Sequence, residues 1–342
     1  MTHAPADPAR GAVLALDIGG TKLAAGVVRA DGEVLSFVTC PTESAAGPEA
    51  SLARLFDLGK HALDQAGVDP GDAPAHLLGC GIGCGGPLDP GRGVLLCPPH
   101  LPGWVDVPIT RLVEDTYGLR AVLDNDGTAG AAGEWRFGAG RGTRHLVYLT
   151  VSTGIGGGFV VDGRTYRGAA GNGGEPGHIT VRSDGRPCRA CGRSGCLEAY
   201  ASGTSISELA REAVALGEAT SLPPDATAVD VSRQARAGDP LARRLWDQTT
   251  SLLGQGVTSI VNLYEPDVVV LGGGVTRAGE QLLSPVRQAV ARLAMGPAAR
   301  AVRVVPAGNG DRAGVLGAAA VAFERLTGTA AASQVPDTAA LT

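Results

Sequence analysis

The chain has 342 residues, of which 44% are hydrophobic and 18% are charged, and its formal net charge is −5 with a pI near 5.7. No apolar run approaches the length of a membrane span, and no dense run of Lys and Arg provides the basic surface that nucleic acid requires. The composition therefore argues against a membrane-spanning protein and a nucleic-acid partner, and the length suits two domains with a cleft between them.

The N-terminal residues 1–12 lack the apolar core of a signal peptide, so we expect a disordered leader and a cytoplasmic protein. The cysteines agree with this location. Three of the seven fall in one short segment, and the others are scattered rather than arranged as a disulfide framework: Cys40, Cys80, Cys84 and Cys97.

Strands and glycine turns alternate at the start of the chain. A strand over Ala12–Leu16 leads into DIGGTK at Asp17–Lys22, and a second strand over Leu23–Val28 ends at an Asp-Gly turn. The same order of strand, glycine turn, strand and Asp-Gly turn recurs over residues 146–151, 152–158, 159–161 and 162–163. This internal repeat predicts a duplicated domain whose two glycine turns face each other across the cleft.

The other predicted elements alternate between helices and strands, as in an α/β fold. Apolar residues at helical spacing predict helices over residues 48–67, 126–137, 204–216, 240–264, 278–293 and 312–326. Short apolar runs predict strands over residues 76–82, 121–123, 267–271 and 302–305. The small, polar residues 328–342 are expected to form a disordered tail.

The DIGGTK turn is a candidate phosphate site. Asp17 stands at a strand end, Gly19 and Gly20 let backbone N–H groups approach a phosphate, and the Thr21 and Lys22 side chains can face it. A P-loop is excluded, because the G-x-x-x-x-G-K-[ST] pattern is absent and a strand follows the turn. A plain β-turn with a surface Asp is the alternative interpretation.

Three further glycine clusters support nucleotide and substrate binding. Thr153-Gly154 in the second turn provides the matching side of a polyphosphate site, and Gly273-Gly274 after a buried strand can let a base lie against the backbone. Gly85-Gly86 can approach a small substrate closely. The G-x-G-x-x-G match that ends at Gly86 is not a dinucleotide site, since Pro87 and Pro90 leave no helix N-terminus for a pyrophosphate.

Asp126 is the candidate general base. Phosphoryl transfer to an alcohol requires a carboxylate within hydrogen-bond reach of the hydroxyl, and Asn125 beside it can donate to and accept from sugar hydroxyls. An N-cap with a turn is the alternative interpretation of Asp-Asn-Asp before a helix. The position between two phosphate turns favours a catalytic role.

The segment 175–198 combines a predicted metal site with two acids. His178, Cys188, Cys191 and Cys196 have the spacing of a tetrahedral zinc site, with Glu175 and Glu198 at the ends. A zinc ion with four protein ligands has no open position, so it would fix the loop that directs both acids and the His at a polar ligand. Three free buried thiols are the alternative, although the Gly, Arg and Ser around them provide no apolar core.

These motifs, in the order DIGGTK, DND, TGIGGG, EPGH, Cys-Gly-x-x-Gly-Cys-x-Glu and LGGG, resemble the repressor, open reading frame and kinase (ROK) family over roughly Val13 to Leu326. The resemblance is to actinobacterial-type glucokinases. It implies an actin-like, hexokinase-like ATPase fold with duplicated ribonuclease H-like domains that close over sugar and ATP. Two departures stand out: C-R-A-C is one residue longer than the usual Cys-x-Cys, and His100 stands where Asn is common.

The resemblance also implies roles for individual residues. Asp126 would be the catalytic base. The sugar hydroxyls would be held by Asn125, Glu175, His178 and Glu198. Gly273-Gly274 would contact the adenosine. The phosphates and Mg²⁺ would be surrounded by residues of the two glycine turns: Asp17, Gly19, Gly20, Thr21, Thr153 and Gly154. A structural Zn²⁺ would be held by His178, Cys188, Cys191 and Cys196.

The expected organisation is a small N-terminal α/β domain over residues 13–124 and a large C-terminal α/β domain over residues 125–327 that contains the zinc segment. The last helix, residues 312–327, is expected to pack back on the N-terminal domain. The family resemblance further implies a homodimer or homotetramer.

The expected activity is transfer of the γ-phosphoryl group of ATP to the 6-hydroxyl of D-glucose, with Mg²⁺ bridging the β- and γ-phosphates. A kinase for N-acetylmannosamine, N-acetylglucosamine or fructose is the alternative within the family. A polyphosphate-dependent kinase is disfavoured by the LGGG cluster. A sugar-sensing repressor is disfavoured because residues 1–12 are too few for a helix-turn-helix domain.

Overall fold

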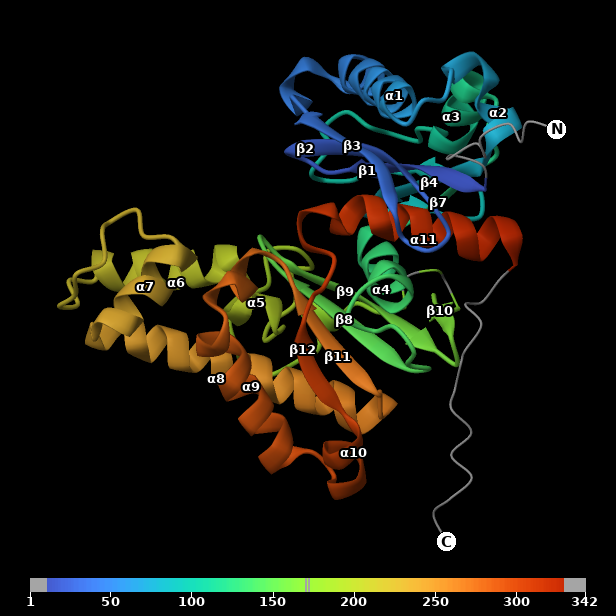
Figure 1. Cartoon of the computed structure of the whole chain (residues 1–342). Coiled ribbons are helices and arrows are strands. Elements are labelled where there is room, and N and C mark those ends of the chain that lie inside the picture. Colours follow the sequence, from blue (N-terminus) through green and yellow to red (C-terminus); the bar gives the residue numbers. More distant parts are fainter. Residues whose placement is uncertain (1–10, 170, 172, 329–342) are drawn as a thin grey trace, which may run out of the picture. The chain divides into compact units, whose positions relative to one another are not determined.

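The computed structural model describes residues 11–169, 171 and 173–328, which fold into two compact units (Figure 1). Unit 1 takes the described residues of Met1–Gly142, Gly163–Gly171 and Gly308–Thr342, and unit 2 takes those of Thr143–Asp162 and Asn172–Ala307. The expected leader and tail lie outside the described residues, apart from residues 11, 12 and 328, and Ala12 already belongs to a strand.

Unit 1 contains a five-stranded sheet in the order β3-β2-β1-β4-β7. β1 (Ala12–Ile18) is antiparallel to β2 (Lys22–Val28), which is antiparallel to β3 (Val34–Pro41). β4 (Leu77–Cys84) is parallel to β1, and β7 (Ala121–Asn125) is parallel to β4. The carboxyl ends of β1, β4 and β7 therefore meet at one edge of the sheet.

The sheet of unit 1 is covered on both faces, as β1 requires, because almost all of its residues are buried and successive side chains point to opposite faces of the sheet. Leu14 and Leu16 pack in the core formed with α1 and α3, whereas Val13 and Ala15 pack in the core formed with α11. The helices and short strands of the unit are α1 (Pro48–Gln65), α2 (Ala73–His76), β5 (Leu88–Asp89), β6 (Val94–Leu95), α3 (Ile109–Tyr117), α4 (Asp126–Arg136), β10 (Arg164–Tyr166) and α11 (Ala313–Thr327).

Small residues allow α4 and α11 to cross closely. A Cβ on Gly133 would lie 2.9 Å from the Cα of Gly317, and a Cβ on Gly317 would lie 2.7 Å from the carbonyl oxygen of Ala129. The Ala/Gly-rich sequence of α4 is therefore a packing requirement of this crossing. Because α4 packs on α11, it belongs to unit 1, whereas the domain boundary predicted from the sequence falls before Asn125.

Within unit 2 the sheet has the order β9-β8-β11-β12. β8 (Leu146–Val151) is antiparallel to β9 (Ile155–Val161), and β11 (Val268–Gly272) is parallel both to β8 and to β12 (Arg303–Pro306). This arrangement of a hairpin followed by two parallel strands repeats β2-β1-β4-β7 of unit 1. The internal repeat in the sequence therefore corresponds to a structural repeat.

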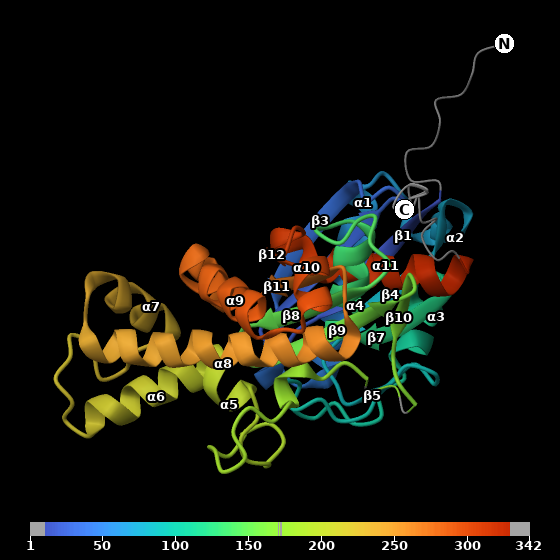
Figure 2. The ribbon, with the colours of Figure 1, turned by 90° about the horizontal axis from the view of Figure 1, so that it is seen from below.

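The helices of unit 2 are α5 (Glu198–Ala201), α6 (Gly203–Ala215), α7 (Ala228–Ala237), α8 (Pro240–Tyr264), α9 (Glu280–Leu293) and α10 (Gly296–Ala301). The long α8 lies alongside α6, α7 and α9 (Figure 2). Among the described residues, none of the helices combines the length and apolar character needed to cross a bilayer.

Most predicted elements are present with their ends shifted by one or two residues, and the α/β class is confirmed. Five α-helices of the described residues were not predicted: α2, α3, α5, α7 and α10. They are short, and α3 and α7 each end at a glycine with positive φ, Gly118 and Gly238.

Candidate active site

The register of the first sheet aligns the predicted phosphate and catalytic residues. Asp17 of β1 pairs with Gly83 of β4, and Gly83 pairs with Asp124 of β7. Beyond this row the chain leaves the three strands at the first glycine turn, at Gly85-Gly86 and at Asn125-Asp126. Because parallel strands of this sheet end at one edge, these three segments emerge side by side, where α/β folds bind ligands.

The first glycine turn is held by backbone hydrogen bonds. The Gly19 N–H donates to the Lys22 carbonyl at 3.1 Å, and the Thr42 hydroxyl donates to the Gly19 carbonyl at 2.6 Å. Thr21 and Lys22 are exposed beyond the turn. A rigid turn with two exposed polar side chains is suited to contact a phosphate.

Asp17 lies where β1 meets the first turn of α11. A Cβ on Gly314 would lie 2.0 Å from the Asp17 Oδ2, so only glycine fits there. Burial and the charge of Asp126 raise the pKa of Asp17 to about 6, with burial the larger cause, and the charge of Lys22 opposes the shift. A cation bound here would favour the ionised carboxylate, so Asp17 fits the oxygen ligand that Mg²⁺ prefers.

His100 packs between two of the glycine segments. A Cβ on Gly20 would lie 2.8 Å from the His100 carbonyl oxygen, and a Cβ on Gly85 would lie 2.5 Å from the His100 Cε1. Burial lowers the pKa of His100, and the charge of Asp126 opposes this shift. Glycine at positions 20 and 85 is therefore required by the close approach of His100.

Asn125 and Asp126 form the start of α4. The Gly127 N–H donates to the Asn125 Oδ1 and to the Asp126 Oδ1, both at 2.8 Å, so Asn125 is the N-cap. The Asn125 Nδ2 faces Gly86, whose Cβ would lie 3.6 Å away. Asp126 is exposed to solvent, yet partial desolvation raises the pKa of its carboxyl against the opposing effects of the Gly127 N–H and His100.

The second glycine turn, which joins β8 to β9, is held by α5 and α6. The Gly203 N–H at the start of α6 donates to the Ser152 carbonyl at 2.7 Å, and the Ile155 N–H donates to the Glu198 Oε2 at 2.7 Å. A Cβ on Gly154 would lie 2.6 Å from the same Glu198 oxygen. Glu198 therefore supports the turn that carries Thr153 and Gly154.

The LGGG cluster continues from β11 into the same region of unit 2. Gly273 has φ +89°, and a Cβ there would lie 2.4 Å from the Val151 carbonyl oxygen. Both its conformation and its close approach to β8 therefore require glycine.

A pocket of roughly 790 Å³ opens beside these two segments of unit 2. It is large enough for a nucleoside, and hydroxyl groups, glycine backbone and an aromatic ring contribute to its wall. Among the lining residues are Thr153, Thr204, Ser207, Thr227, Trp246 and Gly274. Of these, only Thr153 and Gly274 were predicted from the sequence. The T-x-x-D capping box from Thr227 to Asp230 was the available signal for α7, whose first residues line the pocket.

The four predicted zinc ligands lie together. The ligand atoms of His178, Cys188, Cys191 and Cys196 are all within 4.8 Å of one another. The Cys188 Sγ is 3.8 Å from the His178 Nδ1, and the Cys191 Sγ is 3.5 Å from the Cys196 Sγ. Since Zn–S bonds are about 2.3 Å, ligands of a tetrahedral site lie about 3.8 Å apart, so the donor set fits Zn²⁺ despite the longer C-R-A-C spacing.

Ion pairs anchor the cysteine segment to α6. The Arg186 Nη1 and Nη2 donate to Glu212 at 2.5 and 2.7 Å, and the side chain of Arg189, within C-R-A-C, pairs with Glu208. Hydrogen bonds, the strongest from the Arg193 backbone N–H and others from Arg193, Cys196 and Cys188, lower the pKa of Cys191 to about 6 against the effect of burial, which favours the thiolate that binds metal.

The E-x-G-H motif packs on β9. Glu175 is exposed at the start of a short 3₁₀ helix, Pro176–His178, and a Cβ on Gly177 would lie 2.0 Å from the Ile155 carbonyl oxygen.

In unit 1 the predicted site residues gather at one edge of the sheet. In unit 2 they gather around the second glycine turn and the cysteine cluster.

The chain matches the family model described as ROK family over residues 13–325. It is 35% identical to a glucokinase of Thermotoga maritima over 92% of this chain and 98% of that protein. It is 34% identical to an N-acetylmannosamine kinase of Shigella flexneri over 91% of this chain and 98% of that protein.

Solved structures of ROK family proteins also match this chain. A ROK hexokinase from Thermus thermophilus has a TM-score of 0.79 and 37% identity, and covers 93% of this chain and 100% of its own. A ROK family glucokinase from Streptomyces griseus, in complex with glucose and AMPPNP, has a TM-score of 0.71 and 34% identity, and covers 91% of this chain and 99% of its own. The actin-like, hexokinase-like fold is thereby confirmed, and the chain belongs to the ROK family.

Proposed function

We propose that this protein is an ATP-dependent glucokinase that transfers the γ-phosphoryl group of ATP to the 6-hydroxyl of D-glucose. The observation that carries the proposal is the sheet register of unit 1, which places a solvent-exposed carboxylate, Asp126, at the same edge as the glycine turn at Asp17–Lys22. The glucokinase relatives, one of them solved with glucose and an ATP analogue, support the choice of sugar and donor.

Asp126 would act as the general base. Its raised pKa makes the carboxylate a better proton acceptor than an ordinary aspartate. Asn125 uses its Oδ1 to cap α4, so its Nδ2 beside Gly86 is positioned to donate to a sugar hydroxyl. Asp126 would accept the proton of the 6-hydroxyl as the oxygen attacks the γ-phosphorus, while the bond between the γ-phosphorus and the bridging oxygen breaks and ADP leaves with its electron pair.

The donor would occupy the pocket of unit 2. Hydroxyl groups of Thr204, Ser207 and Thr227 can hydrogen-bond a ribose or base, and the backbone N–H groups near Thr153 and Gly274 can approach the phosphates. The turn at Gly19 and Gly20 would bind the transferred phosphoryl group. Mg²⁺, held through the Asp17 carboxylate, would supply charge neutralisation at the phosphates.

The cysteine cluster would hold one structural Zn²⁺. Four protein ligands leave no open position, so the metal would act by fixing the loop between His178 and Glu198. The His178 Nδ1 faces the sulfur atoms, which leaves its Nε2 to donate to a sugar hydroxyl. Glu175 and the Glu198 Oε1 would accept from neighbouring hydroxyls.

The test is a coupled assay of the purified protein with ATP and Mg²⁺ against glucose, mannose, fructose and the two N-acetylhexosamines. We expect the highest kcat/KM with glucose. Asp126→Asn should lower kcat by at least about a hundredfold, with glucose affinity retained in calorimetry. Asp115→Asn, an exposed acid on α3, serves as the matched control. Near-normal kcat in Asp126→Asn would refute the base assignment.

An N-acetylmannosamine kinase is the second candidate, because the Shigella flexneri relative is 34% identical to this chain, against 35% for the Thermotoga maritima glucokinase. Higher kcat/KM with that sugar than with glucose would select it. ATP dependence is tested in the same assay by comparison with inorganic polyphosphate. The cytoplasmic location and the homodimer or homotetramer remain predictions.

A further inference from the structure

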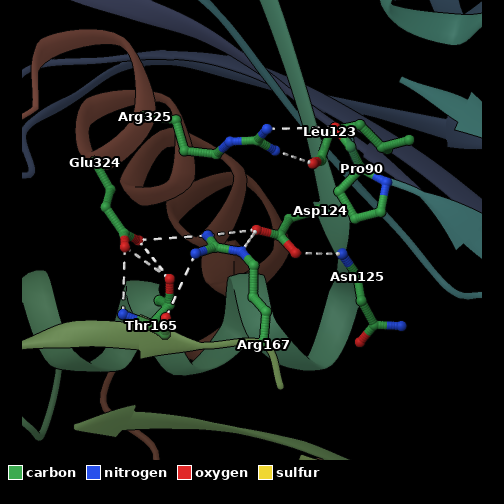
Figure 3. Close-up of polar contacts among 8 residues, drawn as sticks. All are labelled: Pro90, Leu123, Asp124, Asn125, Thr165, Arg167, Glu324 and Arg325. Atoms are coloured by element: carbon green, nitrogen blue, oxygen red, sulfur yellow. Dashed lines mark hydrogen bonds and ion pairs between the residues drawn. The ribbon is translucent and has the colours of Figure 1, made fainter. Parts of the chain in front are cut away.

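A buried ion pair lies directly behind the proposed base. Asp124, the residue of β7 before Asn125, has a side chain that is 1% exposed. Its Oδ2 accepts from the Arg167 Nε at 2.8 Å and lies 2.6 Å from the Arg167 Nη2 (Figure 3). Its Oδ1 accepts from the Asn125 backbone N–H at 3.0 Å. One carboxylate therefore connects a guanidinium to the peptide that leads into Asp126.

Arg167 is itself held in place. Its Nη1 donates to the Thr165 carbonyl at 3.4 Å, and its Nη2 lies 3.6 Å from the Glu324 Oε2 of α11. The Thr165 hydroxyl donates to the Glu324 Oε1 and Oε2 at 2.7 and 2.8 Å (Figure 3). The segment that contains Arg167 is thereby attached to α11.

α11 also holds the end of β7 directly. The Arg325 Nη1 donates to the Leu123 carbonyl at 2.7 Å, and its Nη2 donates to the Pro90 carbonyl at 3.3 Å. The end of β7 is thus fixed at two adjacent residues, Leu123 and Asp124, by two arginines from different parts of the chain.

Burying the charges of Asp124 and Arg167 costs desolvation free energy, and a pair that served only to stabilise the fold would not need to be charged. Burial raises the pKa of Asp124, and the Arg167 charge and hydrogen bonds oppose this shift. Burial also disfavours the Arg167 guanidinium, yet Asp124 and Glu324 together raise its pKa. Apolar residues often replace a buried ion pair without loss of stability, so the pair is weak evidence for stability and points to a role in geometry.

We propose that Arg167 is a positioning residue for phosphoryl transfer, which acts through the Asp124 carboxylate to fix the Asn125 peptide and therefore the direction of the Asp126 side chain. The inference rests on the proposed role of Asp126. Arg167 contacts Asp124, Thr165 and Glu324, and it reaches Asp126 through Asp124 and the Asn125 peptide, so its proposed effect is on the geometry of the base.

Kinetic constants of four variants test the proposal, and Arg29→Met provides a matched loss of an ion-paired arginine on the surface of unit 1. Arg167→Met should lower kcat about 10- to 100-fold, because displacement of a reacting group by about 1 Å has effects of this size. The KM for ATP should change less than about threefold, since neither Arg167 nor any of its contacts lines the proposed donor pocket. Arg167→Lys should recover only part of the loss, because Lys lacks the planar fork that contacts Asp124.

The double variant Arg167→Met/Asp124→Asn separates positioning from folding. It removes both buried charges, and the amide oxygen introduced at position 124 can still accept from the Asn125 N–H, so the double variant should regain most of the kcat that Arg167→Met loses. This variant and Arg167→Lys keep the test valid where Arg167→Met alone does not fold.

Three results would overturn the proposal: wild-type kcat in folded Arg167→Met, a double variant that regains the wild-type Tm without regaining kcat, or a loss in Arg167→Met explained wholly by its unfolded fraction. The fourth variant, Asp126→Asn, is assayed alongside. If Asp126→Asn keeps near-normal kcat, the proposed base is wrong, whereas an inactive Asp126→Asn beside a fully active Arg167→Met rejects only the positioning role.

Discussion

Replacing Gly273 with Ala tests the close approach of the LGGG cluster to β8, and Gly279 provides a matched control. Gly273 has φ +89° and ψ 171°, and Gly279 has φ +64° and ψ −134°, so both adopt conformations that favour glycine. Each Ala substitution should therefore cost about 1–3 kcal/mol of backbone strain. The two sites differ in space, because the new Cβ would lie 2.4 Å from the Val151 carbonyl oxygen at position 273 and meets nothing within 4 Å at position 279.

Steric overlap with the backbone of β8 should add about 1–3 kcal/mol at position 273. We expect the free energy of unfolding to fall by about 2–6 kcal/mol in Gly273→Ala and by about 1–3 kcal/mol in Gly279→Ala, as measured by urea denaturation. Val151 must shift to relieve the overlap and would displace the adjacent Ser152-Thr153 wall of the pocket. The KM for ATP should accordingly rise about 10- to 100-fold in Gly273→Ala and less than about threefold in Gly279→Ala. Equal losses of stability and equal KM values in the two variants would refute this reasoning.

Three further outcomes are expected. The pKa of Asp17 is raised from 3.8 to about 6 in the folded protein, so its ionisation destabilises the fold as the pH rises through this range. In Mg²⁺-free buffer, Asp17→Asn should therefore raise Tm little at pH 4 and most above pH 7. A gain in Tm that does not depend on pH would contradict the raised pKa of Asp17. Removal of zinc with a strong chelator, or Cys188→Ser, should lower Tm by several degrees; metal analysis that finds no zinc in the purified protein would reject the structural metal. Gly85→Ala should raise the KM for glucose, because the new Cβ would lie 2.5 Å from the His100 Cε1. Adding His100→Ala to this variant should reverse part of the rise in KM. Gly86→Ala should raise the KM less, because its Cβ would lie 3.6 Å from the nearest atom.

Local patterns in the sequence were sufficient wherever one short segment determines the structure. The helix predicted over residues 240–264 is α8 with the same bounds, because Asp239 caps it and Pro240 begins it. The Asp239 Oδ1 accepts from the Ala242 N–H at 2.9 Å. The spacing of His178 and the three cysteines likewise gave the donor cluster, since all four lie within one segment.

Features that depend on distant segments could not be predicted in this way. Asp124 was visible as part of DND, but its partner Arg167 lies 43 positions later in a segment without a recognised motif. Thr165 and Glu324 are separated by 159 positions. The predicted domain boundary before Asn125 differs from the boundary of the compact units for the same reason, because the membership of α4 in unit 1 depends on its close crossing with α11.

The return of α11 to unit 1 has a consequence during synthesis of the chain on the ribosome. Val13, Ala15, Ala24 and Val28 form one core with α11, whose residues are translated after all of unit 2. Until Ala313–Thr327 emerges, this apolar face of the first sheet lacks its native cover. The nascent chain therefore completes unit 1 only after all of unit 2 has been made, and a fragment that stops before α11 would expose an aggregation-prone surface.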